Sequence, residues 1–273
     1  MSQARAKHHQ VSRIGTKAIV AGLIFLFLIF ITIPLVSLFT RVSPEDFITA
    51  LSSPLARDAL WLSVITATFS TIVVVILGTP LAYVNARFSY WGRDIVDTLT
   101  DLPIVLPPTV AGLALLMAFG RNGLLGQYLS VFGVQIAFTT VAVVIAQIFV
   151  ASPFYIRQAR SSFEGVDQNL EAASRTLGAT PIQTFFKVTM PLAASSLLSG
   201  IIMTFARALG EFGATLMFAG NFQGKTQTMP LAIYSELQSD MAVSIALAIL
   251  LVVFSFAIIL AVKYIGRREN TYA

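Results

Sequence analysis

The sequence is poor in the residues that carry most enzyme and metal chemistry. Among its 273 residues there is no cysteine, and the two histidines, His8 and His9, stand side by side near the N-terminus. Without cysteine the chain can form no disulfide, no thiolate nucleophile and no sulfur-ligated metal site. Two adjacent histidines without other ligands form no metal-binding pattern either. We therefore expect no metal site and no catalytic residue in this chain, and we do not expect an enzyme.

Charged residues are also scarce. They make up 11% of the chain, about half of their share in an average soluble domain. Hydrophobic residues make up 56%, and the mean hydropathy is +0.80. Six apolar runs approach the roughly 20 residues needed to cross the hydrocarbon core of a bilayer. The runs lie at 18–39, 59–83, 102–119, 134–154, 195–218 and 241–265. The sequence thus predicts an all-α polytopic membrane protein with six transmembrane helices.

These runs divide the chain into four parts. A basic tail at 1–17 precedes the first helix at 18–39, whose apolar part is too long for a secretory signal and lacks a small-residue cleavage site. Residues 59–265 contain the other five helices and one long polar segment at 164–191. A short tail is expected at 266–273.

The distribution of Lys and Arg predicts how the chain lies in the cell membrane. Thirteen of the 18 basic residues fall on the side of the N-terminus, and four fall on the opposite side. Because loops rich in Lys and Arg stay inside, both termini and the segment at 164–191 are predicted to be cytoplasmic. The net charge of +5 is spread along the membrane edges. It therefore predicts contact with the lipid bilayer and no nucleic-acid partner.

One short motif, Gly224-Lys225-Thr226, is similar to the end of a phosphate-binding loop. That loop requires a first glycine five residues before Gly224, where the chain has Ala219. The motif also follows an apolar run instead of a strand, and the distribution of basic residues places it outside the cell. We therefore expect no cofactor in this chain and an energy source in another subunit.

The polar segment at 164–191 shows the signals of a short helix followed by a hinge. Asp167 is a suitable N-cap for a helix that ends at Leu177. Gly178 suits the left-handed residue that closes such a helix.

A second short helix is predicted after the hinge. Thr180 and Gln183 have the spacing of a capping box, and a proline stands at the first helical position between them. Ile182, Phe185 and Phe186 form an apolar stripe on this helix. The stripe would pack on the membrane end of the same chain or insert into a groove of another subunit.

This segment resembles the loop shared by the membrane subunits of ABC importers. The signature of those subunits is Glu-Ala-Ala, three residues, Gly, nine residues, Ile-x-Leu-Pro. The residues at matching positions are Gly178, Val188, Met190 and Pro191. The chain departs from the signature at its first position, which holds Ala172, whereas Glu171 stands one residue earlier.

In that family the loop is a coupling helix that docks on an ATPase. The resemblance therefore implies that this segment transmits nucleotide-driven motion to the spans. The residues that it implicates are Glu171, Ala172, Ala173, Gly178, Ala179, Phe185, Val188 and Pro191. Because of the shift by one residue, the resemblance leaves the role of Glu171 open.

Further motifs are similar to those of the permeases of molybdate importers, with sulfate and tungstate permeases as alternatives. They lie at 106–112, 120–126, 208–216 and 225–234, and the similarity covers about 59–265. It implies a type I importer in which two copies of this chain form the pathway for a tetrahedral oxyanion. It also implies two ATP-binding subunits, which bind the ATP and Mg, and an extracytoplasmic oxyanion-binding protein.

The fifth apolar run contains Arg207 and Glu211, which are four residues apart and would share one helix face. At a lipid-exposed midplane each would cost about 2.5 to 3.5 kcal/mol, so both are expected to face protein or water. A structural ion pair and a place on the translocation path remain equally open. Thr109 and Thr215 are candidate hydroxyl donors to an oxyanion on that path.

Three prolines, at 103, 107 and 108, have two interpretations. We favour a helix entrance over a broken helix that bares backbone groups to the path. An ATP-independent secondary transporter is a remote alternative, since Glu211 is the one acid placed deep in a predicted span. A membrane enzyme would need nucleophiles, bases or metal ligands gathered at one face, and no such cluster is visible. Retention of a nucleotide-binding partner by the purified chain would separate these classes from an importer.

Overall fold

The computed structural model describes the backbone of residues 2–269 and the side-chain surroundings of residue 17 and residues 19–261. Within 2–269 the chain is helical and contains no strand. The elements are α1 (Ser2–Phe39), α2 (Pro44–Ser52), α3 (Pro54–Arg87), α4 (Arg93–Val105), α5 (Pro108–Phe119), α6 (Gly126–Val131), α7 (Thr140–Glu164), α8 (Gln168–Thr176), α9 (Pro181–Thr184), the π-helix η1 (Phe185–Thr189), α10 (Met190–Leu209), α11 (Gly213–Ala219), α12 (Met229–Ser239) and α13 (Met241–Glu269). The last residues of the predicted tail at 266–273 lie outside the described ones.

Five helices of the described chain are long and apolar enough to cross a membrane. They are the apolar parts of α1 and α13, the whole of α3 and α7, and the continuous rod Pro181–Leu209 formed by α9, η1 and α10. The pair of α4 and α5 raises the number to six if it forms one span. The predicted all-α polytopic fold is therefore confirmed. In place of a separate tail at 1–17, α1 already begins at Ser2.

The span predicted at 102–119 is not one helix. The structure has α4 and α5 instead, and the two are bent by 116°. Leu106 lies between them with extended backbone angles, because a residue that precedes a proline avoids the helical region. Pro108 then begins α5 at a position where its missing N–H group is not needed. Pro108 is thus a helix entrance, as favoured, but the helix that it begins is separated from α4 by a sharp bend.

A second break interrupts the run predicted at 195–218. The helix α10 ends at Leu209, and α11 begins at Gly213. Glu211 lies in the link, where its Oε1 accepts a hydrogen bond from the backbone N–H group of Ala214 at 2.8 Å. The spacing predicted that Arg207 and Glu211 share one helix face. In the structure Glu211 instead lies beyond the end of α10.

The fourth span is displaced relative to the predicted run at 134–154. Phe138 has a φ of +64°, a left-handed conformation that an ordinary helix does not contain. The side chain of Thr139 then caps α7, which continues through a polar last part to Glu164. Hydropathy alone did not predict this shift, because the polar residues at the end of α7 lower the apolar signal.

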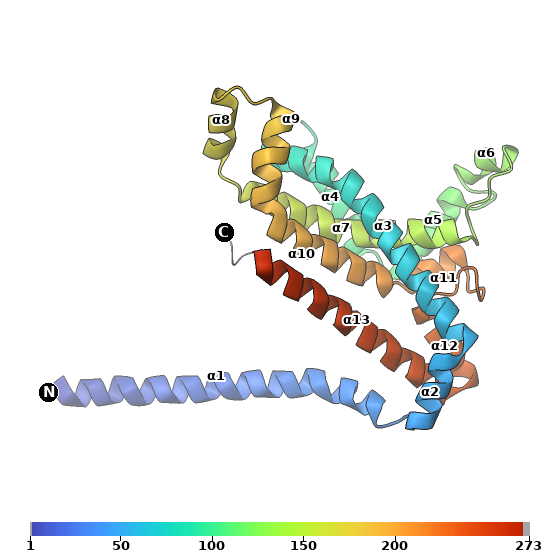
Figure 1. Cartoon of the computed structure of the whole chain (residues 1–273), viewed down its shortest axis with the longest axis horizontal. Helices are drawn as coiled ribbons and strands as arrows, with labels where there is room; N and C mark the ends of the chain where they lie inside the picture. Colours follow the sequence, from blue (N-terminus) through green and yellow to red (C-terminus); the bar gives the residue numbers. More distant parts are fainter. Residues whose placement is uncertain (1, 270–273) are drawn as a thin grey trace.

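The long helices α3 and α7 pack along each other and form the centre of the molecule (Figure 1). Buried polar side chains join them. Ser70 Oγ donates to Gln147 Oε1 at 3.0 Å, and Gln147 Nε2 donates to Thr66 Oγ1 at 3.2 Å. Towards the other end, the hydroxyl groups of Thr79 and Tyr155 lie 2.6 Å apart. Such bonds between helices fix their register where the hydrophobic effect is weak.

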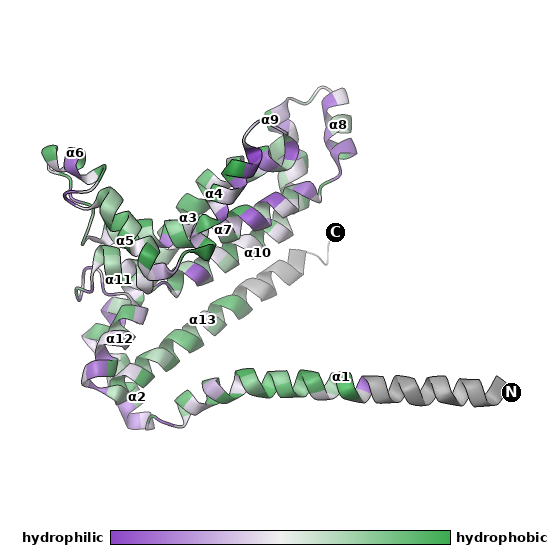
Figure 2. Ribbon diagram, turned by 180° about the vertical axis from the view of Figure 1, so that it is seen from behind, coloured by the Kyte–Doolittle hydropathy of each residue, from purple (hydrophilic) through white to green (hydrophobic). Residues whose placement is uncertain are grey.

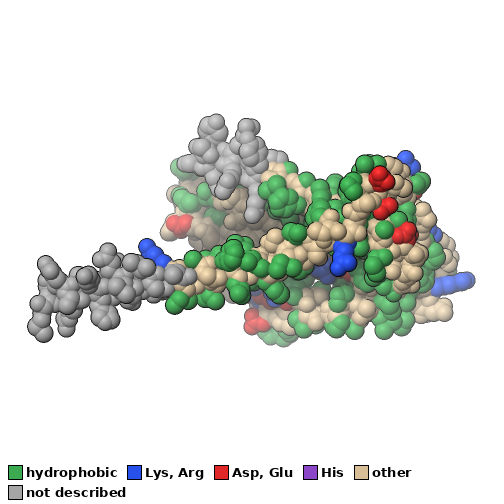
Figure 3. Space-filling view, turned by 90° about the horizontal axis from the view of Figure 1, so that it is seen from below, with side chains coloured by type: hydrophobic (Ala, Val, Ile, Leu, Met, Phe, Trp, Pro, Cys, Tyr) green, Lys and Arg blue, Asp and Glu red, His purple; other side chains and the backbone are tan. Residues whose placement is uncertain are grey.

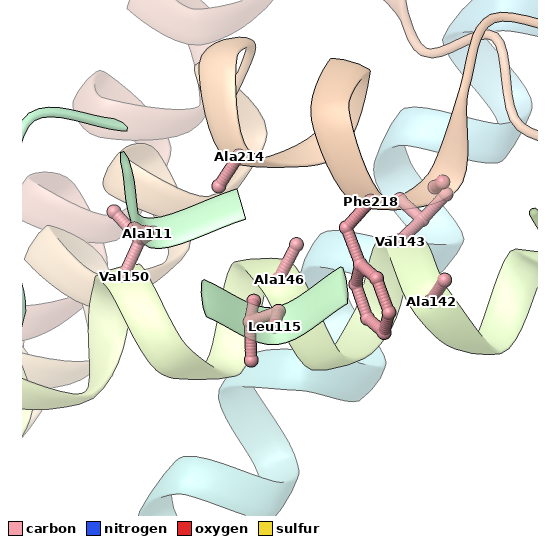
Figure 4. Packing of buried hydrophobic residues seen from close by; sticks show 9 residues of the cluster. Ala111, Leu115, Ala142, Val143, Ala146, Val150, Ala214 and Phe218 are labelled. Carbon is pink, nitrogen blue, oxygen red and sulfur yellow. The ribbon is translucent and has the colours of Figure 1, made fainter. Parts of the chain in front are cut away.

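The short helices α5 and α11 pack on the first half of α7 and form an apolar cluster around Leu115 and Phe218 (Figure 4). Gly112 lets α5 approach α11 closely, because a Cβ atom at this position would lie 2.7 Å from the carbonyl oxygen of Ala214. Gly213 allows the same approach at the start of α11, where its Cβ atom would lie 2.7 Å from Pro108. The two helix breaks therefore meet.

The helix α1 projects from the rest of the molecule and contacts it mainly at α13 (Figure 1). No residue in its most apolar window is buried within the chain. The exposed surfaces of α3 and of the described parts of α1 and α13 are largely hydrophobic, whereas α8 is more polar (Figure 2). Few charged side chains interrupt the hydrophobic surface on the face shown in Figure 3. These surfaces suit a bilayer better than water.

A candidate coupling segment and a charged helix junction

The segment at 164–191, the candidate coupling segment, begins as predicted. The side chain of Asp167 accepts a hydrogen bond from the N–H group of Asn169 at 2.9 Å and caps α8. Gly178 has a φ of +91°. Its N–H group donates to the carbonyl of Arg175, and that of Ala179 donates to the carbonyl of Ser174. This pair of bonds is a Schellman motif, so the predicted left-handed helix end is confirmed.

The second helix of the segment also has its predicted cap. The N–H group of Gln183 donates to Thr180 Oγ1 at 3.3 Å, and the N–H group of Thr180 donates to Gln183 Oε1 at 2.9 Å. The predicted capping box is therefore confirmed. The sequence did not predict that the next residues, Phe185–Thr189, form a π-helix that joins α9 to α10 without a break. Such local widening of a helix is frequent at functional sites.

The outer end of the segment exposes apolar side chains. Leu177 is 89% exposed and Ile182 is 71% exposed, although both are hydrophobic. The nearby Ala172, Ala173 and Pro181 are exposed as well. A surface of this kind on a short pair of helices suits insertion into a groove of another subunit.

The inner side of the segment packs on the ends of α3 and α7. The ring centroid of Phe185 lies 4.8 Å from that of Tyr83 and 5.9 Å from that of Phe163. Val188 is half-buried, and Pro191 stands in the first turn of α10. The apolar stripe of the second helix is therefore divided, because Phe185 faces its own chain while Ile182 and Phe186 remain exposed.

Glu171 is buried, in contrast to its neighbours on α8. Its Oε1 lies 2.8 Å from Arg87 Nη2 and 3.1 Å from Arg87 Nε. Thr189 Oγ1 donates to the same oxygen at 2.8 Å. Arg87 is 84 residues away in the chain, and sequence reasoning used it only to orient the protein. Neither Arg87 nor Thr189 carried a local signal of this contact.

A second set of ion pairs fastens α4 to α7 near the candidate coupling segment. Arg160 pairs with Asp97, and Arg157 pairs with Asp101. Asp97 also accepts a hydrogen bond from the buried Asn85 at 2.7 Å. The acidic face of the amphipathic α4 thus lies on the basic face of α7, which holds the bent helix in place.

The four path candidates gather where the two helix breaks meet. Arg207 Nη1 lies 2.8 Å from Glu211 Oε2, although this oxygen has no aligned hydrogen-bond donor in the described part of the chain. Glu211 is 1% exposed and Arg207 is 28% exposed. Thr109 is exposed at the start of α5, close to Gly213. Thr215 is buried, and its hydroxyl group has no partner among the described residues.

The described residues contain no group of three or more His, Asp or Glu side chains that could hold a metal ion. At the two sites above, Arg87 pairs with Glu171, Arg207 pairs with Glu211, and Asp167 caps a helix. The arrangement offers anchoring and mechanical contact instead of a reactive centre.

The fold is that of the membrane-spanning permeases of type I ABC importers. It is similar to a chain of a bacterial ABC transporter involved in the import of the acidic polysaccharide alginate, with a TM-score of 0.72 and 18% identity over 92% of this chain and 94% of the other. It is also similar to a chain of the MetNI methionine ABC transporter, with a TM-score of 0.63 and 20% identity over 78% of this chain and 95% of the other.

The chain belongs to the family of binding-protein-dependent transport system inner membrane components, whose model matches residues 75–271. It is 44% identical to the molybdenum transport system permease protein ModB of Mycobacterium tuberculosis over 86% of this chain and 89% of that protein. It is 40% identical to the probable transport system permease protein NifC of Clostridium pasteurianum over 90% and 85%. It is 32% identical to the probable sulfate transport system permease protein cysT of Chlorokybus atmophyticus over 88% and 85%.

Proposed function

We propose that this chain is the permease subunit of an ATP-driven importer of molybdate. The observation that carries the substrate assignment is its higher identity to molybdenum permeases, 40–44%, than to sulfate permeases, 32–36%. Sulfate or tungstate is the second candidate, because the sulfate relatives match over most of their length and all three anions are tetrahedral.

The proposed complex contains two copies of this chain, two ATP-binding subunits and an extracytoplasmic oxyanion-binding protein. The exposed apolar end of the candidate coupling segment supports a docking role towards the ATP-binding subunits, which would bind the ATP and Mg. The distribution of basic residues supports cytoplasmic termini. In this arrangement the segment at 164–191 faces the subunits that hydrolyse ATP.

The helix junction would form the path or gate in this proposal. A dianion needs transient compensation of its charge, and a site that bound it tightly would not release it. Arg207 is largely neutralised by Glu211, and the remaining donors, Thr109 and Thr215, are uncharged. This weak field suits passage, and it leaves selection of the anion to the external binding protein.

The proposal is tested by uptake into vesicles. The complete complex is reconstituted into proteoliposomes with its binding protein, and labelled molybdate is offered with ATP, with a non-hydrolysable ATP analogue or without nucleotide. We expect uptake only with ATP and binding protein, and stronger competition by tungstate than by sulfate. Binding calorimetry of the binding protein with the three anions provides the matched control.

Two results would contradict the proposal. Uptake by the permease alone, without ATP, would identify a secondary transporter. Preferential uptake of sulfate, together with tighter sulfate binding by the partner protein, would favour the second candidate.

A further inference from the structure

The most unusual feature of the candidate coupling segment is how its first helix is attached. Glu171 is the one residue of α8 that is buried. Leu170 is 48% exposed, and the alanines that follow Glu171 are exposed too. α8 therefore has no apolar side that could fasten it to the membrane-spanning helices, and its neighbours are chiefly η1 and α9. A buried carboxylate takes the place of a hydrophobic anchor.

Three donor atoms converge on one oxygen of this carboxylate. They are Nε and Nη2 of Arg87 and Oγ1 of Thr189, at 3.1, 2.8 and 2.8 Å from Glu171 Oε1. Arg87 Nη2 also donates to the carbonyl of Val166 at 3.0 Å. Bonds that involve ionised groups on both sides are shorter and stronger than neutral ones. The contact is thus directional as well as attractive.

The contact joins the inner ends of three spans. Arg87 is the last residue of α3, and Val166 stands just beyond the end of α7. Thr189 is the last residue of η1 and leads directly into α10. Through Glu171, α8 is therefore bound to α3 and α10, which pack on α7 and on each other.

Burial makes this pair different from an exposed ion pair. The side chains of Arg87 and Glu171 are 6% and 7% exposed. Removal of one partner leaves an uncompensated buried charge, whereas an exposed pair contributes little. The same burial prevents Glu171 from reaching a partner subunit, so its carboxylate acts within this chain.

We propose that Arg87 and Glu171 are positioning residues that make α8 move together with α3 and α10. The proposal rests on the proposed function, since the motion that they transmit is that of the ATP-binding subunits. With the pair in place, a displacement of the exposed end of the segment is passed to the spans. Without it, α8 is held by its contacts with η1 and α9 alone, and the displacement is lost.

The first experiment compares the complete wild-type complex with the double variant Arg87→Ala/Glu171→Ala. The double variant carries no unpaired buried charge, so it should insert and assemble. We expect the stimulation of ATP hydrolysis by the loaded binding protein, and the molybdate taken up per ATP, to fall about fivefold or more. The matched control is Arg57→Ala/Asp58→Ala, an exposed pair at the start of α3, which should stay within about twofold of wild type.

The outcomes of this comparison are distinct. If the double variant keeps the wild-type ratio of uptake to ATP hydrolysis, the pair does not position α8 and the proposal is overturned. If the wild-type complex itself shows no ATP-dependent uptake, the proposed function fails instead. Should the double variant not assemble, Arg87→Met/Glu171→Gln, which keeps similar side-chain volumes and removes both charges, carries the same test.

A second readout does not depend on transport. Because the chain has no cysteine, two exposed residues, Ala172 on α8 and Thr98 on α4, can be replaced by cysteine and spin-labelled. We expect one narrow distance distribution with the Arg87–Glu171 pair intact and a broad one in the double variant. An unchanged narrow distribution would overturn the positioning role.

Discussion

Gly178 shows how one residue can determine the geometry of a whole segment. Its φ of +91° closes α8, and nothing lies within 4 Å of the place where a Cβ atom would stand. Space is therefore not what requires glycine here. The left-handed backbone is the requirement, since it costs a residue with a side chain about 1–2 kcal/mol. The direction of α9 relative to α8 depends on this residue.

The variant Gly178→Val should separate transport from ATP hydrolysis. A β-branched residue disfavours the left-handed conformation, so α8 and α9 change their relative direction while the spans stay inserted. We expect the uptake per ATP in proteoliposomes to fall about fivefold or more.

A matched control is available at Gly92, which has a φ of +89° and equally open surroundings but lies outside the candidate coupling segment. Gly92→Val should cause similar backbone strain and leave the coupling ratio near that of wild type. Full uptake by Gly178→Val, or an equal loss in both variants, would argue against a hinge at this residue.

At the scale of elements, the junction between the two broken helices brings buried polar groups together, among them Glu211 and Thr215. Glu211 caps the start of α11 and lies beside Arg207 at the end of α10. Each residue therefore has a structural role as well as a candidate role on the path. Removal of one charge alone would confuse the two roles, because the other charge would be left unpaired.

A pair of variants distinguishes these roles. Arg207→Ala should lower uptake and destabilise the purified chain, since the buried carboxylate of Glu211 loses its cation. The double variant Arg207→Met/Glu211→Gln should recover thermal stability, because similar volume is kept without charge. If Arg207 serves the path, uptake by the double variant stays several-fold low. Recovery of uptake together with stability would identify the pair as purely structural.

Local signals predicted some elements well and others not at all. The caps at Asp167 and Thr180 and the helix end at Gly178 were predictable, because each depends on residues a few positions apart. The break at Glu211 was not predictable, because Gly210 and Gly213 are equally typical of small residues at a helix contact inside a continuous span. The contact between Glu171 and Arg87 was not predictable either, because only the packing of α3 beside the segment brings Arg87 close.

At the scale of the whole molecule, the two functional regions lie at opposite ends of the central helices. The candidate coupling segment follows the end of α7, and the helix junction packs on the first half of that helix. Both ends can be addressed separately, since no native cysteine interferes with labelling.

The predicted orientation can be measured in intact cells with Leu177→Cys and Leu124→Cys. Both side chains are well exposed, at 89% and 73%, and they lie at the two opposite ends. A membrane-impermeant maleimide should label the residue at 124 in intact cells and the residue at 177 only after the cells are opened. Labelling of the residue at 177 from outside would reverse the topology and contradict a coupling role.

The uninterrupted helical path from Pro181 to Leu209 has a mechanical consequence. Its 29 residues form a shaft of about 43 Å at 1.5 Å per residue. The end at Pro181 is exposed to solvent, and Arg207 lies near the other end. Because no loop intervenes, a tilt of a few degrees at the tip sweeps the far end by a few ångströms, on the order of the length of a hydrogen bond. The continuous helix thus acts as a lever, and the displacement of its far end is enough to open or close a single polar contact.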